Sequence, residues 1–218
     1  MQKQSGFTIV EMAVVVFVIG LLVAGVMSGK NLLAGSQGRA VISEMEEYQG
    51  AMRMFQQKYF DWPGDITNAT ELWPTDGTRD GDGNERVEWD NMEGVLMWKH
   101  LELAKMIGQT GFTNVATANA VVGQNVPGSK IAGAGWFVNW DATMKNFIGI
   151  GAQNTNGMNI VPALSAKRAY DIDVKIDDAN PALGMVQSDG AGCVDAGGTY
   201  ATSDESPNCV MRFSLEQK

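Results

Sequence analysis

The chain opens with a long apolar stretch that contains a single charged residue. From Phe7 to Met27 almost every side chain is hydrophobic, and only Glu11 carries a charge. A helix needs about 20 residues to cross the hydrocarbon core of a bilayer, so residues 7–29 are long enough to span a membrane. A carboxylate at that depth costs about 3 kcal/mol. We therefore expect Glu11 to have a partner or a function.

The next stretch, residues 30–60, is amphipathic. Its large apolar residues recur every three or four positions, which is the period of one face of an α-helix. We predict one continuous helix over about residues 8–59, loosened near Gly29, Gly35 and Gly38. Its second half presents an apolar stripe that we interpret as core packing under a globular head. The stripe consists of Ile42, Met45, Tyr48, Met52, Phe55 and Tyr59.

A loop and a second helix follow the first. Pro63-Gly64 and Pro74 are signals that end a helix and begin a loop. Residues 91–107, "NMEGVLMWKHLELAKMI", return to the helical period. Gly108 follows directly and is a candidate C-cap, because glycine adopts the backbone conformation that commonly ends a helix.

The sequence pattern after residue 110 predicts mainly strands. Between residues 111 and 160, the short apolar runs "GWFVNWD" and "NFIGIG" are typical of strands joined by glycine-rich turns. Residues 164–176 alternate apolar and polar side chains as a strand does, and they could also form a helix capped by Ser165. The final apolar run, "VMRFSL", predicts a last strand.

Charge narrows the partners that the head can have. The formal net charge is -9, from 16 Lys and Arg and 25 Asp and Glu, and the acidic excess lies after residue 60. An acidic surface repels the phosphate backbone, and the largest basic cluster is the pair Lys167-Arg168. We therefore expect no nucleic-acid partner.

The two cysteines and the single histidine limit the kinds of catalytic and metal site that the chain can form. Cys193 and Cys209 predict a single disulfide if the head is exported; two reduced thiols in a cytosolic protein are the alternative. The closed loop would contribute about 3 kcal/mol. His100 is the only histidine, and we expect it to be a surface or half-buried packing residue. No CxxC, GxSxG or Walker sequence occurs, so we predict that the protein is not an enzyme.

One acidic segment, "DGTRDGDGNERVEWD", carries candidate metal ligands. Asp80, Asp82 and Asn84 stand at alternate positions, like the first ligands of an EF-hand loop. Glu85 replaces the glycine at the sixth position, and Asn91 replaces the glutamate at the twelfth. The candidate calcium ligands are Asp80, Asp82, Asn84 and Glu88, with Asp90 and Glu93 as further replacements. The alternative interpretation is a solvated acidic turn.

The N-terminus differs from an ordinary secretory signal peptide. Such a peptide has a basic start, an apolar run and then a small-residue cleavage site. Here a polar leader, "MQKQSG", ends at Gly6 before the apolar run begins, so cleavage after Gly6 would leave the hydrophobic helix on the mature chain. Lys3 favours a cytoplasmic N-terminus, with the rest of the chain outside.

The hexamer "GFTIVE", Gly6 to Glu11, resembles the processing motif of type IV pilins and type II secretion pseudopilins. The resemblance is close over about the first 30 residues and beyond them concerns architecture alone. It implies that a membrane-embedded prepilin peptidase cuts between Gly6 and Phe7 and that Phe7 is then N-methylated. It also implies that Glu11, the fifth residue of the mature chain, pairs with the N-terminal amine of a neighbouring subunit. Many members have a proline in the second half of this helix, where this chain has none.

The same resemblance implies an α+β fold. A long N-terminal helix, hydrophobic in its first half and amphipathic in its second, would pack on a small antiparallel-sheet head with a C-terminal disulfide loop. The expected organisation is a leader peptide over 1–6, a transmembrane or filament-core helix over 7–29, its amphipathic continuation over 30–60 and an extracytoplasmic head over 61–218.

We therefore expect a structural subunit, major or minor, of a type IV pilus-like or type II secretion filament. Its partners would be the prepilin peptidase, other pilin or pseudopilin subunits and an inner-membrane assembly platform. It would cross the inner membrane once with a cytoplasmic N-terminus and then enter an extracytoplasmic filament. The alternatives are a minor tip or adhesin subunit that binds a ligand or initiates assembly, and a membrane-tethered extracytoplasmic enzyme.

Overall fold

The computed structural model describes residues 8–113 and 117–216. The chain falls into two compact units, Met1–Gln37 and Gly38–Lys218. Helix α1 (Ile9–Tyr59) begins in the first unit and ends in the second. This confirms the prediction of one long N-terminal helix. The helix continues through Gly29, Gly35 and Gly38 without a break.

The first unit contains the apolar part of α1. From Thr8 to Gly29 every residue is exposed. Within the described part of the chain, the stretch Ile9–Gly29, 21 residues long, is the one helical segment whose length and composition suffice to cross a membrane. Such a surface needs lipid or other apolar groups around it, since exposed apolar area is unfavourable in water.

In the second unit, the amphipathic part of α1 forms the centre of the core. Of the predicted stripe, Met45, Tyr48, Met52 and Phe55 are buried, and Ile42 and Tyr59 are partly buried against the core, so the interpretation of the stripe as core packing is confirmed. The Tyr48 ring lies edge-on to Trp98, with ring centroids 5.0 Å apart, and to Trp136, at 5.6 Å. Val41 and Ala51, which the predicted stripe did not include, are buried on the same helix.

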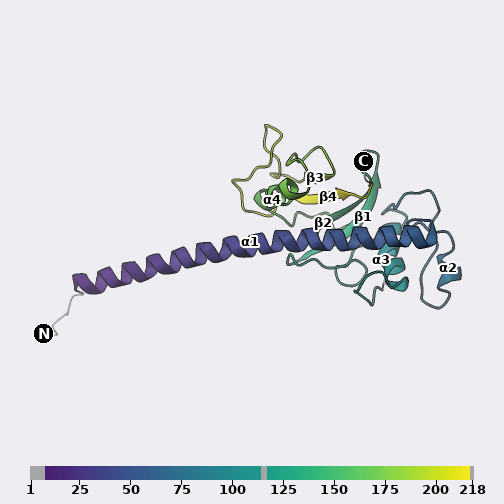
Figure 1. Cartoon of the computed structure of the whole chain (residues 1–218), viewed down its shortest axis with the longest axis horizontal. Helices are drawn as coiled ribbons and strands as arrows, with labels where there is room; N and C mark the ends of the chain where they lie inside the picture. Colours follow the sequence, from purple (N-terminus) through teal and green to yellow (C-terminus); the bar gives the residue numbers. More distant parts are fainter. Residues whose placement is uncertain (1–7, 114–116, 217–218) are drawn as a thin grey trace. The chain divides into compact units, whose positions relative to one another are not determined.

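A four-stranded antiparallel sheet completes this core (Figure 1). The strands are β1 (Ala134–Asp141), β2 (Lys145–Ala152), β3 (Val186–Asp189) and β4 (Val210–Ser214). Their order in the sheet is β1-β2-β4-β3. The runs "GWFVNWD", "NFIGIG" and "VMRFSL" therefore form strands as predicted, and the fold class is α+β with an antiparallel sheet.

The two faces of the sheet have different partners. On one face, Trp136 Nε1 donates a hydrogen bond of 2.9 Å to Glu44 Oε2 of α1. On the other face, the rings of Phe137 and Phe147 meet edge-on, with centroids 6.2 Å apart. A Cβ at Gly149 would lie 2.2 Å from the Phe137 ring, so this strand position needs glycine. The first face therefore joins the sheet to α1, while the second carries the buried pair of Phe137 and Phe147.

Two short helices precede the sheet, and the second of them ends earlier than predicted. They are α2 (Ala69–Leu72) and α3 (Glu93–Leu103). Lys105 adopts a φ of 59°, and the Met106 N–H donates to the Leu101 carbonyl at 3.0 Å. This is the geometry of a Schellman motif, which ends a helix with a left-handed residue. The prediction that Gly108 caps this helix was therefore wrong, because Lys105 takes the left-handed conformation three residues earlier.

Most of the segment 164–176 forms a helix. Helix α4 (Ala166–Ile176) begins at Ser165, whose side chain accepts a hydrogen bond from the Arg168 N–H at 3.4 Å. The buried residues of α4 recur at helical spacing, and Tyr170 and Val174 are exposed. Of the two alternatives, the helix capped by Ser165 is confirmed and the strand was wrong, because the alternating apolar positions lie on different sides of the helix and only one stripe is buried.

The C-terminal disulfide is present. Cys193 and Cys209 are bonded, with Cα atoms 5.0 Å apart, and both are fully buried. Within the closed loop, the Tyr200 hydroxyl donates to Asp173 Oδ2 of α4 at 2.8 Å. The disulfide loop is therefore also joined to α4 through a buried hydrogen bond.

Candidate functional site

The first turn of α1 carries the predicted assembly residue, Glu11. Its Oε2 accepts hydrogen bonds from the Thr8 N–H, at 2.7 Å, and from the Thr8 hydroxyl, at 2.8 Å. The Glu11 N–H in turn donates to Thr8 Oγ1 at 3.3 Å. This reciprocal pair is a capping box, in which a threonine and a glutamate three residues later satisfy the free N–H groups of a helix start.

The predicted processing residues precede this turn. Gly6 and Phe7, the sites predicted for cleavage and N-methylation, lie outside the described residues, as does the predicted leader 1–6. The capping box defines the start of the helix at Ile9, the third residue after the predicted cut. A mature N-terminal amine at Phe7 would therefore lie close in sequence to the Glu11 carboxylate.

A second candidate site is an acidic cluster in the head. Carboxylate oxygens of Asp65, Asp82 and Glu93 all lie within 4.8 Å of one another. Asp65 and Glu93 are buried, with 0% and 1% of their surface exposed, and Asp82 is exposed. Burial raises the pKa of Asp65 to about 6 and that of Glu93 to about 7. Three carboxylates in this arrangement could hold a metal ion, since hard cations take oxygen ligands.

Both buried carboxylates also organise the surrounding loop. Asp65 accepts backbone hydrogen bonds from residues 83–85 at 2.7, 3.1 and 2.7 Å. Glu93 accepts one from the Asp82 N–H at 3.2 Å and one from the Glu88 N–H at 3.0 Å. These hydrogen bonds hold the segment 82–88 against Glu93 at the start of α3 and against Asp65 in the loop after α1.

Only part of the predicted calcium set joins this cluster. Asp82 belongs to it, but Asp80 instead accepts hydrogen bonds from the Thr70 N–H and hydroxyl, at 2.8 and 3.0 Å. Asn84 donates to Asp82 Oδ2 at 3.0 Å, and more weakly to Glu88 Oε2 at 3.5 Å. Asn84 and Glu88 thus neighbour Asp82 without contributing to the group of three. Sequence reasoning missed Asp65, because it precedes the acidic segment and no ligand spacing points to it.

His100 differs from its prediction. It is fully buried, whereas we expected a surface or half-buried residue. Its Nδ1 accepts a hydrogen bond from the Gly64 N–H at 2.9 Å, and its Nε2 lies 3.1 Å from the Arg79 carbonyl. The ring stacks on Trp73, with centroids 5.8 Å apart. Burial lowers the pKa of His100 to about 4, so the ring is neutral. It joins α3 to the loop segments that contain Gly64 and Arg79.

A second acidic group lies at the end of α4. Oxygens of Asp173, Asp177 and Asp178 are within 4.8 Å of one another. Asp173 accepts from Tyr200 and from the Ala179 N–H at 3.3 Å, and Asp177 accepts from the Val186 N–H at 3.1 Å. These contacts join α4 to β3 and to the disulfide loop. They give this group a structural role.

Comparison with known proteins gives a match at the N-terminus. Residues 1–27 match the family model described as the prokaryotic N-terminal methylation motif. No curated protein and no solved structure matches the chain. The matched segment contains Gly6, Phe7, Thr8 and Glu11 and most of the exposed apolar part of α1. The chain thus carries the N-terminal methylation motif that is typical of type IV pilins and pseudopilins.

Proposed function

We propose that the protein is a structural subunit, a pilin or pseudopilin, of a type IV pilus-like or type II secretion filament. The observation that carries this proposal is a fully exposed apolar helix of 21 residues within and directly behind the methylation motif. Burying apolar surface contributes about 25 cal/mol per Å², so this helix is stable in a bilayer or against other apolar helices. Pilins are generally not enzymes, which agrees with a structural role.

The proposed maturation follows from the same segment. A prepilin peptidase cuts between Gly6 and Phe7 and methylates the new N-terminus, while α1 anchors the subunit in the inner membrane. The head then lies outside the cytoplasm, and an assembly platform moves the subunit into the filament. Glu11 is the only charged residue among the described residues 8–29, so it is the one available ionic partner for a neighbouring amine within this span.

Mass spectrometry of the mature N-terminus tests this maturation. We expect a chain that begins with methylated Phe7, and we expect Gly6→Ala to block cutting, because a peptidase must fit the residue before the scissile bond closely. An intact Met1, or cleavage beyond Met27, would overturn the proposal. The amount of the subunit in sheared filaments, relative to other subunits, then distinguishes a major subunit from a minor tip or adhesin subunit.

We further propose that the head binds calcium at Asp65, Asp82 and Glu93. The ligand type fits, because calcium takes six to eight oxygens, which carboxylates, backbone carbonyls and water supply. The fit is limited by the backbone hydrogen bonds that Asp65 and Glu93 already accept. Asp82 offers the most accessible oxygens, and it is the residue on which the test should focus.

Thermal unfolding of the full chain in detergent, with calcium or with a chelator, tests this site. At a calcium concentration 100-fold above the dissociation constant, binding adds about 2.7 kcal/mol to the free energy of unfolding. Asp82→Asn should remove the response, measured as the difference between the midpoints of the same variant in calcium and in chelator, because Asp82 supplies the exposed carboxylate of the group. An unchanged wild-type midpoint, with no calcium binding by calorimetry, would overturn the calcium site and support the alternative of a solvated acidic turn.

A further inference from the structure

A pocket lies at the end of β1, next to the start of α3, and the proposed function makes no use of it. Its volume of about 470 Å³ falls within the range of small-molecule sites, about 300–1,000 Å³. Gly94 of α3 lets the walls approach closely, because a Cβ there would lie 2.6 Å from the Val138 carbonyl oxygen and 2.5 Å from the Trp89 ring. We call this hollow the Trp140 pocket. It is lined by Glu88, Trp89, Asp90, Asn91, Asn139 and Trp140.

Hydrogen bonds fix the lining of the pocket. Trp89 is 4% exposed, and its backbone N–H donates to Asn139 Oδ1 at 3.0 Å. The Trp89 indole Nε1 donates to the Ala118 carbonyl at 2.6 Å. Asn91 Oδ1 accepts from the Glu93 N–H at 3.2 Å. These side chains are therefore positioned before a ligand arrives, which lowers the entropy cost of binding.

The lining keeps unpaired hydrogen-bond donors. Asn91 and Asn139 are both bonded through the amide oxygen, and within residues 8–113 and 117–216 neither Nδ2 group makes a hydrogen bond. Trp140 is partly exposed, and its Nε1 has no hydrogen-bond partner in the same part of the chain. Three side-chain N–H groups are thus available to a ligand.

Two carboxylates in the lining supply unpaired acceptors. Asp90 is exposed, and no described residue forms a hydrogen bond or an ion pair with its carboxylate. Glu88 makes two long contacts, 3.5 Å from Asn84 Nδ2 and 3.9 Å from the Arg86 guanidinium. The sequence offered Glu88 and Asp90 as calcium ligands, but neither belongs to the acidic groups found in the described residues. Their oxygens are therefore available in the pocket.

The indole of Trp140 adds an aromatic surface. The Arg86 guanidinium stacks on the ring, 4.1 Å from its centroid, and Lys145 Nζ lies 5.8 Å from it. A cation over an aromatic face is attracted to it, so these contacts hold the ring in place. Neither Arg86 nor Lys145 lines the pocket. The part of the ring that does line the pocket is therefore left uncovered by them.

This set of groups selects one class of ligand. A hydroxyl both donates and accepts, so a polyhydroxylated ligand matches unpaired amide donors and carboxylate acceptors together. The C–H face of a sugar ring packs on an indole, which has a large apolar body. Two carboxylates repel anions, and the unpaired N–H groups have no role toward a bare cation.

We infer that the Trp140 pocket binds a neutral saccharide. Glu88 and Asp90 accept hydrogen bonds from its hydroxyls, the two asparagine amides donate to them, and the sugar ring stacks on Trp140. The inference goes beyond the filament function and does not depend on it, because the pocket lies within the head of a single chain.

Binding of defined oligosaccharides to the full chain tests the pocket. The probes are neutral oligomers of glucose, galactose, mannose and N-acetylglucosamine, with oligogalacturonate as the acidic counterpart of the galactose series. Ligand-detected NMR registers weak binding, and the detergent must lack a sugar headgroup, which would compete. We expect at least one neutral oligomer to bind, and oligogalacturonate to bind about tenfold more weakly than that oligomer or not at all, since like charges repel. If no neutral oligomer binds, or if the acidic one binds best, the inference is overturned.

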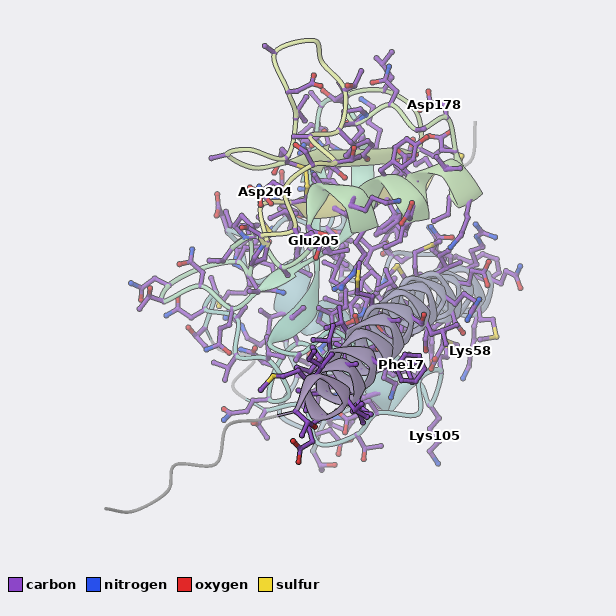
Figure 2. All side chains as sticks on the ribbon, turned by 90° about the vertical axis from the view of Figure 1, so that its left-hand side faces the viewer. Phe17, Lys58, Lys105, Asp178, Asp204 and Glu205 are labelled. Atoms are coloured by element: carbon purple, nitrogen blue, oxygen red, sulfur yellow. A yellow bond between two sulfur atoms is a disulfide. The ribbon has the colours of Figure 1, made fainter. Side chains whose placement is uncertain are left out.

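A carboxylate substitution locates the site. Asp90→Asn keeps the size of an exposed side chain that has no hydrogen bond or ion pair in the described structure, so the melting midpoint should not change. Affinity should fall about tenfold, the loss expected for one hydrogen bond to a charged group. The matched control, Glu205→Gln, neutralises an exposed carboxylate in the loop closed by the disulfide (Figure 2). This control should leave the affinity unchanged.

Aromatic substitutions test the stacking. Trp140→Ala should abolish binding, whereas Trp140→Phe keeps an aromatic face and should restore part of it. Tyr170→Ala is the control, because Tyr170 is another partly exposed ring, 38%, with a cation, Lys167, 6.0 Å from its centroid. It should bind as the wild type does. A lower melting midpoint in Trp140→Ala leaves Asp90→Asn and Trp140→Phe to decide the question.

The outcomes separate the pocket from the filament function. Wild-type affinity in folded Asp90→Asn and Trp140→Ala, or a loss of affinity in Glu205→Gln or Tyr170→Ala, would place binding elsewhere and overturn the inference. Processed subunits that enter filaments but bind no neutral oligomer would overturn the pocket and leave the filament function intact. A chain that binds the oligomer but is never processed would overturn the filament function and leave the pocket.

Discussion

Glu11 accepts two hydrogen bonds from Thr8 through the same carboxylate oxygen, Oε2, at 2.7 and 2.8 Å. Within the described part of the chain, no hydrogen bond reaches its other oxygen, Oε1. The carboxylate can therefore cap its own helix with one oxygen and accept a neighbouring amine with the other. The proposed pairing between subunits does not require the capping box to open.

Substitutions at Glu11 can separate these two roles. Glutamine also completes a capping box, so Glu11→Gln keeps the helix start and removes the charge, whereas Glu11→Ala removes both. If the charge pairs with a neighbouring amine in the apolar span, loss of the pair costs about 3 kcal/mol, roughly 100-fold in assembly, in both variants. Membrane-bound and filament-bound protein are measured for each variant, with processing at Gly6 checked in parallel. If Glu11→Gln gave the same filament yield as the wild type, the capping role alone would explain the need for Glu11.

His100 should make the head sensitive to mild acid. Its pKa is about 4 in the folded state and 6.5 without the fold, so between these values the unfolded chain binds more protons. Stability is therefore complete above pH 6.5 and falls as the pH drops towards 4, by about 3 kcal/mol. Denaturant unfolding between pH 7 and 4 measures this, and His100→Gln should flatten the part of the slope that this histidine supplies. An equal slope in the variant would contradict the assignment.

Glu93 should act in the opposite direction. Its pKa rises from 4.5 to about 7 on folding, mainly through burial, so the folded state binds more protons in this window. The Glu93 contribution therefore makes the metal-free protein less stable as the pH rises from 4.5 to 7. Glu93→Gln should raise the melting midpoint at pH 7.5 in chelator and should also weaken any response to calcium. A lower midpoint in chelator would show that its hydrogen bonds to the loop outweigh its buried charge.

The disulfide should contribute measurably to the stability of the head. Closing a loop with a sequence separation of 16 contributes about 3 kcal/mol in the chain-entropy model. The double variant Cys193→Ser with Cys209→Ser should lower the free energy of unfolding by this amount, as measured by denaturant titration. A matched reduction of the wild-type protein with dithiothreitol should give the same loss. A change below about 1 kcal/mol would indicate that the buried Tyr200–Asp173 bond holds the loop without the disulfide.

The sequence by itself determined the features that depend on local pattern. The uncharged run after Glu11 and the stripe from Met45 to Phe55 predicted a single helix with two environments, and α1 has both. The two cysteines predicted a single bond if the head is exported, with reduced thiols as the alternative, and the structure has the bond. The apolar bursts that became β1 and β2 were recognisable as short continuous apolar runs bounded by turns, and both strands are buried at consecutive positions.

Only the tertiary structure decided the features that depend on distant neighbours. Alternation in residues 164–176 matched a strand, yet the cap at Ser165 and packing of one stripe made it a helix. Asp65 joins Asp82 and Glu93 only because the loop folds back, so no spacing in the sequence predicted that group. His100 is buried because Gly64 and Arg79 meet its two ring nitrogens. Burial and hydrogen bonding of a polar side chain are set by whichever segments surround it, and the local sequence does not contain that information.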